Sequence, residues 1–310
     1  MHIHVIHENP EWLEPLARAL DAEALPWRDW FLDRGVFDLS RPPPEGVFYN
    51  RMSASSHTRD HRYAAELTAS VLAWLAGHGR RIVNGPRALD LEISKTRQYA
   101  ALAAAGIRTP RTVLVAGTEH LIAAARRHFD GGPVILKPNR GGKGLGVRLF
   151  QTAEALAGYL DSADYEPPVD GLHLLQQYVR APQPLITRAE FIGGRFLYAV
   201  EVDTSDGFEL CPADVCAIDD LACPAGDQSR GKFTIIDDID AGLKEHYEAF
   251  LAANDIEVAG IEFIADANGA TYTYDVNTNT NYNVEAESRA GRDAMMTLAS
   301  FLGAALNALR

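Results

Sequence analysis

The stretch VAGIEFIADANGATYTYDVN, residues 258–277, contains two runs of alternating side chains that are joined by Asn268-Gly269. An Asn-Gly pair favours a two-residue type I′ turn, so the pattern predicts a β-hairpin in which residue 267 faces residue 270. Counting outward from that turn gives an apolar face and a polar face. The apolar face pairs Ile261 with Val276, Phe263 with Tyr274 and Ala265 with Tyr272, and the polar face pairs Glu262 with Asp275 and Gly260 with Asn277.

The polar face of this predicted hairpin places two carboxylates opposite each other. Their Cβ atoms would be only ~5 Å apart, so the two charges would repel. A divalent cation between Glu262 and Asp275 removes the repulsion, and Asn277 on the same face adds a third oxygen. Mg²⁺ prefers such oxygen ligands, and Mn²⁺ is an alternative ion. A solvent-exposed polar face with one raised carboxylate pKa is the other interpretation.

The asparagines at 279, 281 and 283 continue the alternation beyond the strand. We expect them to leave the strand as a polar loop beside the metal, where Asn279 would contact a polar substrate through its amide. Ordinary turn formation explains the same residues equally well.

A second hairpin is predicted in VILKPNRGGKGLGVRLF, residues 134–150, where an apolar strand ends at Lys137 and a second strand begins at Val147. The glycines between them allow backbone amides to approach a phosphate closely. The segment is neither a Walker loop nor a dinucleotide fingerprint, because both of those lead into a helix. A flexible surface hairpin is the alternative. The glycines are Gly141, Gly142, Gly144 and Gly146.

The rest of the chain reads as an α/β unit followed by a longer α+β unit. Residues 1–90 alternate short apolar strands with helical spacing, which favours a parallel βαβ arrangement. Residues 110–175 mix short strands with two predicted helices, 118–129 and 152–161, and suggest a compact lid. A helix is also expected from Ile93 to Ala105, and two more at 240–253 and 290–309.

Composition limits the class of protein. The chain has 310 residues, 47% of them hydrophobic and 23% charged, and a net charge of −13, which argues against general affinity for nucleic acid or anionic membrane. The N-terminus lacks a signal-peptide pattern and no apolar run approaches ~18 residues, so we expect a cytoplasmic protein. Cys211, Cys216 and Cys223 fit neither a paired disulfide framework nor a zinc site and are interpreted as reduced thiols.

Four segments in this order resemble the ATP-grasp superfamily, in particular its RimK-like glutamate ligase branch of carboxylate-amine ligases. They are SKTRQYAALAAAGIRTPRT, VILKPNRGGKGLGV, LLQQYV and the pair IEFI…YDVN. The resemblance implies an ATP-grasp fold of the α/β (α+β) class, with a pre-ATP-grasp domain at 1–90, an ATP-grasp domain at 91–310, the lid inside it, and a C-terminal antiparallel sheet. It also implies ATP and Mg²⁺.

The same resemblance assigns roles to individual residues. Lys95 and Lys137 would neutralise phosphate charge below the glycine loop, and Arg188 would approach the transferred phosphate. Glu262, Asp275 and Asn277 match the metal ligands, and Gln177, Tyr178 and Val179 would border adenine. The sequence departs from the family pattern at three positions: Gln177 replaces the usual Glu, Ile186 stands where Asp is common, and Thr280 replaces a common proline. Helix-surface and salt-bridge roles remain the alternatives for Lys95 and Arg188.

The function implied is an ATP-dependent ligase that joins a carboxylate to an amine through an acyl phosphate. Its substrates would be small molecules or peptides, with no nucleic acid and no membrane as partner; assembly as a homo-oligomer stays open. A kinase and a non-catalytic nucleotide-binding protein are the alternatives. Arg51 begins a cationic segment that is either a carboxylate-binding wall or a solvated loop, and its other members are His57, Arg59, His61 and Arg62. Arg230 (with Lys232) and Arg289 are further candidates for a substrate carboxylate.

Overall fold

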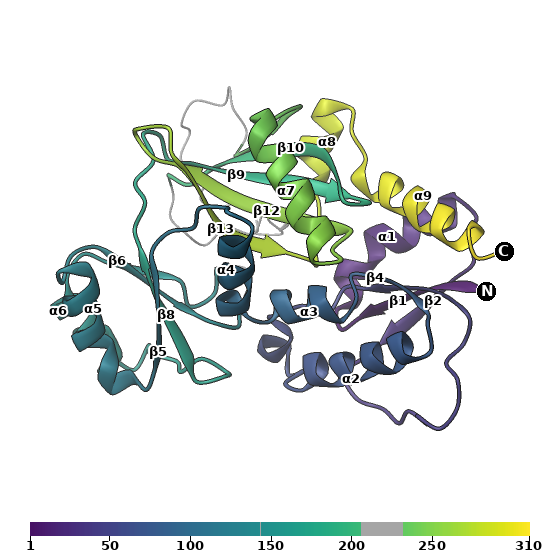
Figure 1. Ribbon diagram of the computed structural model, residues 1–310, viewed down its shortest axis with the longest axis horizontal. Helices are drawn as coiled ribbons and strands as arrows, with labels where there is room; N and C mark the ends of the chain where they lie inside the picture. Colours follow the sequence, from purple (N-terminus) through teal and green to yellow (C-terminus); the bar gives the residue numbers. More distant parts are fainter. Residues whose placement is uncertain (143, 206–231) are drawn as a thin grey trace, which may run out of the picture.

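The computed structural model describes residues 1–142, 144–205 and 232–310. Its three sheets follow one another along the chain and lie in three parts of the molecule (Figure 1). Because the described ranges end at 205 and resume at 232, Arg230 and the three cysteines lie outside them.

The first sheet is parallel and has the strand order β2-β1-β3-β4. Asn9 caps helix α1, with its side chain accepting from Glu11 N and Trp12 N, and Pro10 occupies the first helical position, where a missing N–H costs nothing. The elements of this region are β1 (His2–His7), α1 (Pro10–Ala22), β2 (Trp27–Phe31), β3 (Gly46–Asn50), η1 (Ser56–Arg59), α2 (Ala64–Gly77), β4 (Arg81–Val83) and α3 (Pro86–Glu92).

The second sheet is antiparallel, in the order β5-β8-β6-β7, and helices α5 and α6 lie together on it at the left of Figure 1. Before it, α4 begins at Lys95 because Ser94 caps it by accepting from Arg97 N. The elements are α4 (Lys95–Ala104), β5 (Thr112–Ala116), η2 (Thr118–His120), α5 (Leu121–Phe129), β6 (Val134–Pro138), β7 (Arg148–Phe150), α6 (Ala153–Leu160) and β8 (Leu172–Gln177).

The third sheet is also antiparallel, and its described strands run in the order β11-β10-β9-β12-β13. The predicted helix 290–309 is one helix, Ala294–Asn307, which begins later than predicted because Gly291 ends the preceding helix in a left-handed conformation and Asp293 caps the next one. The elements are β9 (Leu185–Ile192), β10 (Arg195–Asp203), β11 (Phe233–Ile236), α7 (Ala241–Ala253), β12 (Val258–Ala265), β13 (Thr271–Asn277), α8 (Val284–Ala290) and α9 (Ala294–Asn307).

The β12–β13 hairpin confirms the predicted register near the carboxylates and contradicts it near the turn. Glu262 faces Asp275 and Gly260 faces Asn277, but the predicted pairs Phe263–Tyr274 and Ala265–Tyr272 are wrong, because a bulge at Tyr274 shifts the register by one residue. The turn is one residue longer than predicted: Asp266 N donates to Ala270 O at 3.0 Å. The longer loop and the bulge offset each other.

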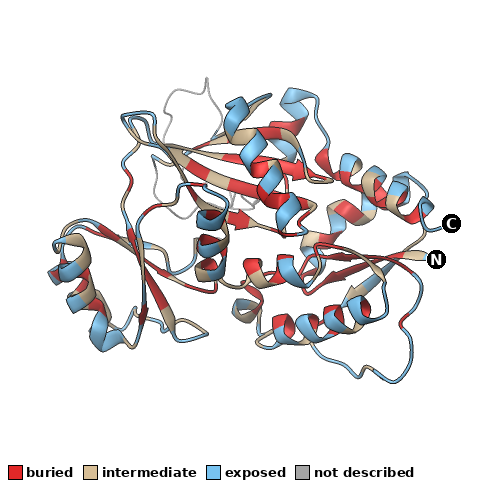
Figure 2. Cartoon of the chain, in the orientation of Figure 1, coloured by how far each residue is buried: buried red, intermediate tan, exposed pale blue. Residues whose placement is uncertain are grey.

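One hydrophobic core joins the two ends of the chain. Helix α9 packs against α1 and reaches β1 and β3, so the C-terminal helix covers the N-terminal sheet, and both termini lie at the same end of the molecule (Figure 1). Figure 2 shows the inward faces of α7 and α9 buried and their outer faces exposed. Among the described residues, no helix is long and apolar enough to cross a membrane.

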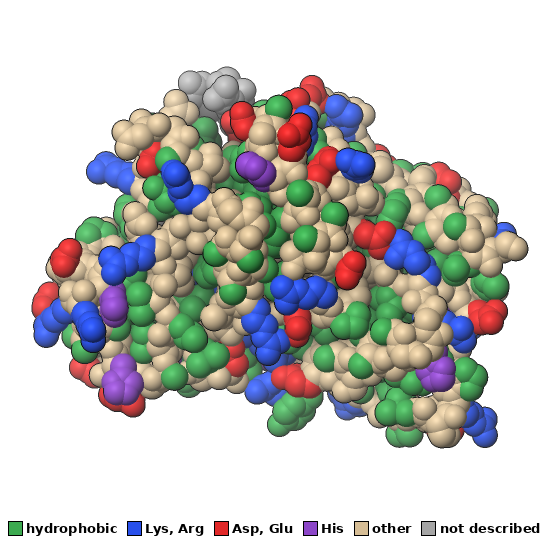
Figure 3. Space-filling view, in the orientation of Figure 1, with side chains coloured by type: hydrophobic (Ala, Val, Ile, Leu, Met, Phe, Trp, Pro, Cys, Tyr) green, Lys and Arg blue, Asp and Glu red, His purple; other side chains and the backbone are tan. Residues whose placement is uncertain are grey.

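Acidic and basic side chains are interspersed on the face drawn in Figure 3. The surface of the described residues also has exposed ion pairs, such as Arg126–Glu154 at 3.0 Å, and such pairs contribute little stability individually. The charges that are informative about function are therefore the buried ones.

Candidate active site

Three charged residues form a row across adjacent strands of the third sheet. Arg188 on β9 faces Glu262 on β12, which faces Asp275 on β13. The Arg188 guanidinium lies over Gly260, where an added Cβ would come within 2.4 Å of Nε. A glycine is needed there because no side chain fits below the guanidinium.

The two carboxylates of this row have different partners. Asp275 Oδ1 accepts from Lys95 Nζ at 2.6 Å, whereas Glu262 accepts from two neutral donors, the Tyr274 hydroxyl and, at 3.3 Å, Asn277 Nδ2. Burial raises the pKa of Glu262, and the charge of Asp275 raises it further. The positive charges of Arg188 and Lys95 oppose this rise without cancelling it, so a bound cation would stabilise the Glu262 carboxylate further.

The donor set fits a hard divalent cation. No described group of three or more His, Cys, Asp and Glu side chains could hold a metal, but this set consists of two carboxylates and one amide. Glu262, Asp275 and Asn277 supply oxygen atoms from neighbouring positions of one hairpin, which is the chemistry Mg²⁺ prefers. Asn277 would have to turn its amide, since its Nδ2 now points to Glu262.

Lys95 is positioned by the contact between α4 and the strand before the glycine hairpin. Its backbone N donates to Asn139 O at 3.1 Å, and Thr96 N donates to Asn139 Oδ1 at 2.9 Å. Asn139 thus satisfies two of the free amides at the start of α4. Because Lys95 Nζ also donates to Asp275, this contact links the glycine hairpin of the second sheet to the β12–β13 hairpin of the third.

Lys137 lies close to the same carboxylates but contacts a neutral group. Its ammonium donates to the Tyr99 hydroxyl, which also accepts from Gln176 Nε2 at 3.0 Å and donates to Tyr274 O at 2.8 Å. Burial, more than the nearby charge of Lys95, lowers the pKa of Lys137 to about 7. Tyr99 connects β6, β8 and the bulge of β13 at one point.

One cavity of about 490 Å³ between the second and third sheets is lined by Lys95, Lys137, Glu262 and Asp275. Its volume is ordinary for a site that takes a small molecule. The glycine hairpin covers one side, and the segment after β8 covers another. Of the residues that the sequence predicts for ATP and metal, the lining includes Lys95, Lys137, Gly141, Gly142, Gly144, Gln177, Tyr178, Val179, Glu262 and Asp275.

Three other predicted residues lie next to this lining. Gly146 adopts a φ of +73° beside Pro138, and Asn277 contacts Glu262. Arg188 is buried and forms an ion pair with Glu190, Nε to Oε1, at 2.8 Å.

The three departures from the family pattern have defined surroundings. Thr280 donates to Glu190 Oε2 at 2.9 Å and accepts from the Arg188 guanidinium, so the hydroxyl at this position orients the arginine. Ile186 lines the cavity. Gln177 accepts from Arg111 N at 3.2 Å, which ties it to β5.

The four predicted substrate residues do not come together. Arg51 is buried and donates to Asn279 Oδ1 at 3.3 Å, so these two adjoin each other next to the end of β13. Arg289 is exposed and donates to Phe233 O at 2.9 Å. The fourth, Arg230, lies outside the described residues.

The sequence reasoning missed several residues of the site. Tyr99 lies one helical turn after Lys95 on α4, and that spacing could have placed both on the same side of the helix. Gly260 interrupts an apolar strand, which is a recognised sign of close approach by another group. Glu190 and Gln176 carry no comparable signal because each depends on contacts with distant strands.

The sheet order and the cavity between two antiparallel sheets define the ATP-grasp fold, and the α/β architecture expected from the sequence is confirmed. The RimK domain ATP-grasp protein of Sphaerobacter thermophilus superposes with a TM-score of 0.65 at 18% identity, covering 97% of this chain and 99% of that chain. The ATP-grasp ligase PsnB, in complex with a minimal precursor, Mg and ADP, gives a TM-score of 0.64 at 18% identity, covering 97% and 96%. D-alanine–D-alanine ligase of Bacillus anthracis gives 0.64 at 13% identity, covering 97% and 96%.

Sequence similarity is weaker than structural similarity. No family model matches the chain. Beta-citrylglutamate synthase B of Danio rerio is 26% identical over 166 residues, which are 52% of this chain. The matched region spans only 39% of the length of that curated relative.

Proposed function

We propose that the protein is an ATP-dependent carboxylate-amine ligase that forms an amide or peptide bond through an acyl phosphate. The observation that supports it best is the row Arg188–Glu262–Asp275, with Lys95 and Lys137 at one cavity. The proposal includes the roles of the site residues and the division into domains at residue 90. Amino acids or small peptides are its substrates.

The chain's own residues would act on charge and position. Lys95 and Lys137 would contact phosphate oxygens of ATP below the glycine hairpin, and Arg188 would stabilise the charge that develops on the transferred phosphoryl group. Glu262, Asp275 and Asn277 would hold Mg²⁺, which supplies further neutralisation of the phosphates when bound. Gln177, Tyr178 and Val179 would border the adenine ring.

The reaction would proceed in two balanced steps. A substrate carboxylate oxygen attacks the γ-phosphorus of ATP, the bond to the bridging oxygen breaks, and ADP leaves. An amine then attacks the acyl carbon, phosphate leaves, and the amine loses a proton. The cavity walls must exclude water between the steps, because water would hydrolyse the acyl phosphate.

Hydroxylamine trapping tests the ligase assignment against the kinase alternative. The full chain is incubated with ATP, Mg²⁺, hydroxylamine and pools of carboxylic acids without amine. We expect release of ADP and a hydroxamate detected by mass spectrometry. A stable phosphate ester with no hydroxamate and no amide would overturn the ligase in favour of the kinase, and nucleotide binding without turnover over the whole substrate panel would favour the non-catalytic alternative.

A further inference from the structure

The parallel sheet has a topological switch point between β1 and β3. The chain leaves β1 toward β2 on one side and leaves β3 toward β4 on the other, so the two connections diverge. Open α/β sheets bind ligands at the carboxyl ends of strands at such a point. The residues that follow the two strands here are Glu8 and Asn9 after β1, and Arg51 after β3.

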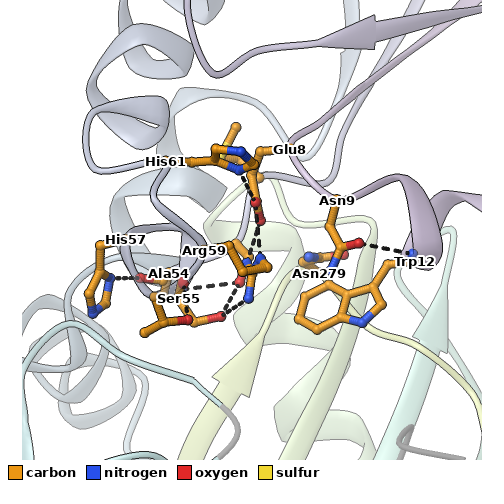
Figure 4. Close-up of polar contacts among 12 residues, drawn as sticks. Glu8, Asn9, Trp12, Ala54, Ser55, His57, Arg59, His61 and Asn279 are labelled. Atoms are coloured by element: carbon orange, nitrogen blue, oxygen red, sulfur yellow. Dashed lines mark hydrogen bonds and ion pairs between the residues drawn. The ribbon is translucent and has the colours of Figure 1, made fainter.

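A cluster of polar side chains occupies this place (Figure 4). We call it the switch-point cluster; it consists of Glu8, Arg51, Arg59, His61, Asn279 and Asn281. Glu8 is buried and accepts from Arg59 Nη2 at 2.5 Å and from Arg59 Nε at 3.1 Å. His61 Nδ1 lies 3.0 Å from the same carboxylate.

Arg59 is fixed in place but not enclosed. Its guanidinium lies 4.8 Å from the centre of the Trp12 ring, and Nη1 donates to Ser55 Oγ at 3.2 Å. Hydrogen bonds to described residues therefore use three of its five N–H groups. One quarter of the side chain is exposed, so the remaining donors can reach a ligand.

Arg51 brings a second positive charge that no described carboxylate neutralises. It is 2% exposed, and its described partners are all neutral: Trp12 O at 3.0 Å, Thr280 O at 3.2 Å, and the side-chain oxygens of Asn279 at 3.3 Å and Asn281 at 2.5 Å. A buried cation among neutral acceptors is costly, and an anion nearby offsets that cost.

Arg51 also orients the two asparagines. Because the Oδ1 atoms of Asn279 and Asn281 accept from Arg51, their Nδ2 groups point away from it. No described residue accepts from either Nδ2, and both side chains are half-buried. The amides thus keep N–H donors that no described residue uses, next to the positive charge of Arg51.

We infer that the switch-point cluster is a subsite for a substrate carboxylate other than the one that ATP phosphorylates. Arg59 and the Nδ2 groups of Asn279 and Asn281 bind it, and Arg51 stabilises its charge from behind. The inference rests on the proposed ligase function and specifies its substrates: either the acid has a second carboxylate, or the amine is an amino acid or peptide with a free carboxylate. Asn279 directly continues the metal strand, so the subsite adjoins the reacting groups.

Binding of small carboxylates tests the subsite without requiring turnover. Calorimetry compares glutarate with glutaramide, and glycylglycine with glycylglycinamide, each added to the full chain with MgADP. We expect at least one carboxylate to bind about tenfold or more tightly than its amide, because hydrogen bonds to a charged group are stronger than those to a neutral amide. Tighter binding of glutarate than of glutaramide would show that the carboxylate belongs to the acid substrate. Tighter binding of glycylglycine than of glycylglycinamide would show that it belongs to the amine substrate.

Two variants should weaken this binding by about tenfold or more while MgADP binding stays unchanged. Arg59→Gln removes hydrogen-bond donors to the bound carboxylate. Asn279→Asp replaces an amide donor with a negative charge. The second variant keeps the test valid if Arg59→Gln fails to fold because Glu8 has lost its partner. The control is Arg28→Gln on β2 of the same sheet, an exposed arginine that should bind like the wild type.

The outcomes separate the subsite from the ligase proposal. Equal binding of acid and amide, equal binding in wild type and both variants, or no binding of any probe would overturn the subsite, even if hydroxamate forms. Carboxylate binding that depends on Arg59 or Asn279, with no hydroxamate from any acid, would support the subsite and overturn the ligase.

Discussion

The β12–β13 hairpin and the switch-point cluster contain charges of opposite sign in similar surroundings. In the hairpin, the Glu262 carboxylate meets neutral donors from Tyr274 and Asn277. In the cluster, the Arg51 guanidinium meets neutral acceptors from Trp12, Asn279, Thr280 and Asn281. Each charge is hydrogen-bonded to neutral groups of the described residues, and a bound ligand of opposite charge would stabilise it further.

The difference between the two regions indicates two kinds of ligand on either side of one short segment. The hairpin favours a cation and the cluster favours an anion, and residues 277–281 pass from one to the other. Thr280 joins them: its hydroxyl contacts Arg188 and Glu190, while its carbonyl accepts from Arg51. A substrate carboxylate in the cluster would therefore lie close to the row that includes Arg188.

The largest expected effect comes from Asp275→Asn, which should impair the proposed metal site of the hairpin and leave the switch-point cluster intact. Losing one charge from the metal site should lower kcat by about 100-fold or more and abolish stabilisation by Mg²⁺ in thermal melts. Carboxylate binding at the switch-point cluster should remain. Asp237→Asn, at an exposed ion pair with Arg292, is the control. Wild-type turnover of Asp275→Asn at ordinary Mg²⁺ concentrations would refute the metal assignment.

Gly260→Ala tests the arginine that lies between the two regions. The new methyl group would overlap Arg188, coming within 2.4 Å of Nε and 2.8 Å of Nη2, and should displace it. We expect kcat to fall about 100-fold, as for loss of a group that stabilises transition-state charge, with little change in ATP affinity. Gly158→Ala, where an added methyl meets nothing within 4 Å, should leave kcat unchanged. Normal kcat in Gly260→Ala would exclude a role for Arg188 in phosphoryl transfer.

The sequence predicted the arrangement of the polar residues on the β12–β13 hairpin far better than the arrangement of the switch-point cluster. Glu262, Asp275 and Asn277 lie on strands joined by a short turn, so alternation alone places them on one face. Even there the predicted turn length was wrong, and the pairing at the carboxylates is correct because the bulge at Tyr274 offsets the longer turn. The carbonyl of Tyr274 accepts from the distant Tyr99 hydroxyl, a contact that alternation along the hairpin does not indicate.

The cluster could not be predicted as a unit because its members come from four separate segments. Glu8, Arg51, Arg59 and Asn279 meet only when the third sheet packs against the first. The sequence indicated a cationic segment from Arg51 to Arg62, yet gave no reason to separate its members. In the structure Arg62 instead contacts Glu66 and Val169 O.

The pH dependence of ATP binding tests Lys137, a third buried charged group whose hydrogen-bond partner, Tyr99, is neutral. Burial lowers the pKa of Lys137 to about 7, so in the free protein the ammonium loses its proton as pH rises above 7. Bound phosphate favours the ammonium, and ATP affinity should fall by up to about tenfold for each pH unit above 7. Calorimetry in two buffers of different ionisation enthalpy should show proton uptake above pH 7. Lys137→Arg stays charged and should abolish the uptake; uptake that persists would assign the titration to another group.

Tyr99→Phe should have the smallest effect and shows whether neutral hydrogen bonds position these charges. The change keeps the ring but removes the hydroxyl that accepts from Lys137 and Gln176 and donates to Tyr274 O at 2.8 Å. Unfolding free energy should fall by about 1–3 kcal/mol, because a buried carbonyl loses its donor. If the hydroxyl also positions Lys137, the KM for ATP should rise about tenfold, roughly the contribution of one hydrogen bond to a charged group, while carboxylate binding at the switch-point cluster stays unchanged.

Tyr165→Phe removes a hydroxyl that contacts His173 at 2.8 Å, outside the cavity lining, and should leave KM unaltered. A loss of stability in Tyr99→Phe with an unaltered KM would mean that Tyr99 supports the fold only, and that Lys137 is positioned by the charges of Asp275 and Glu262.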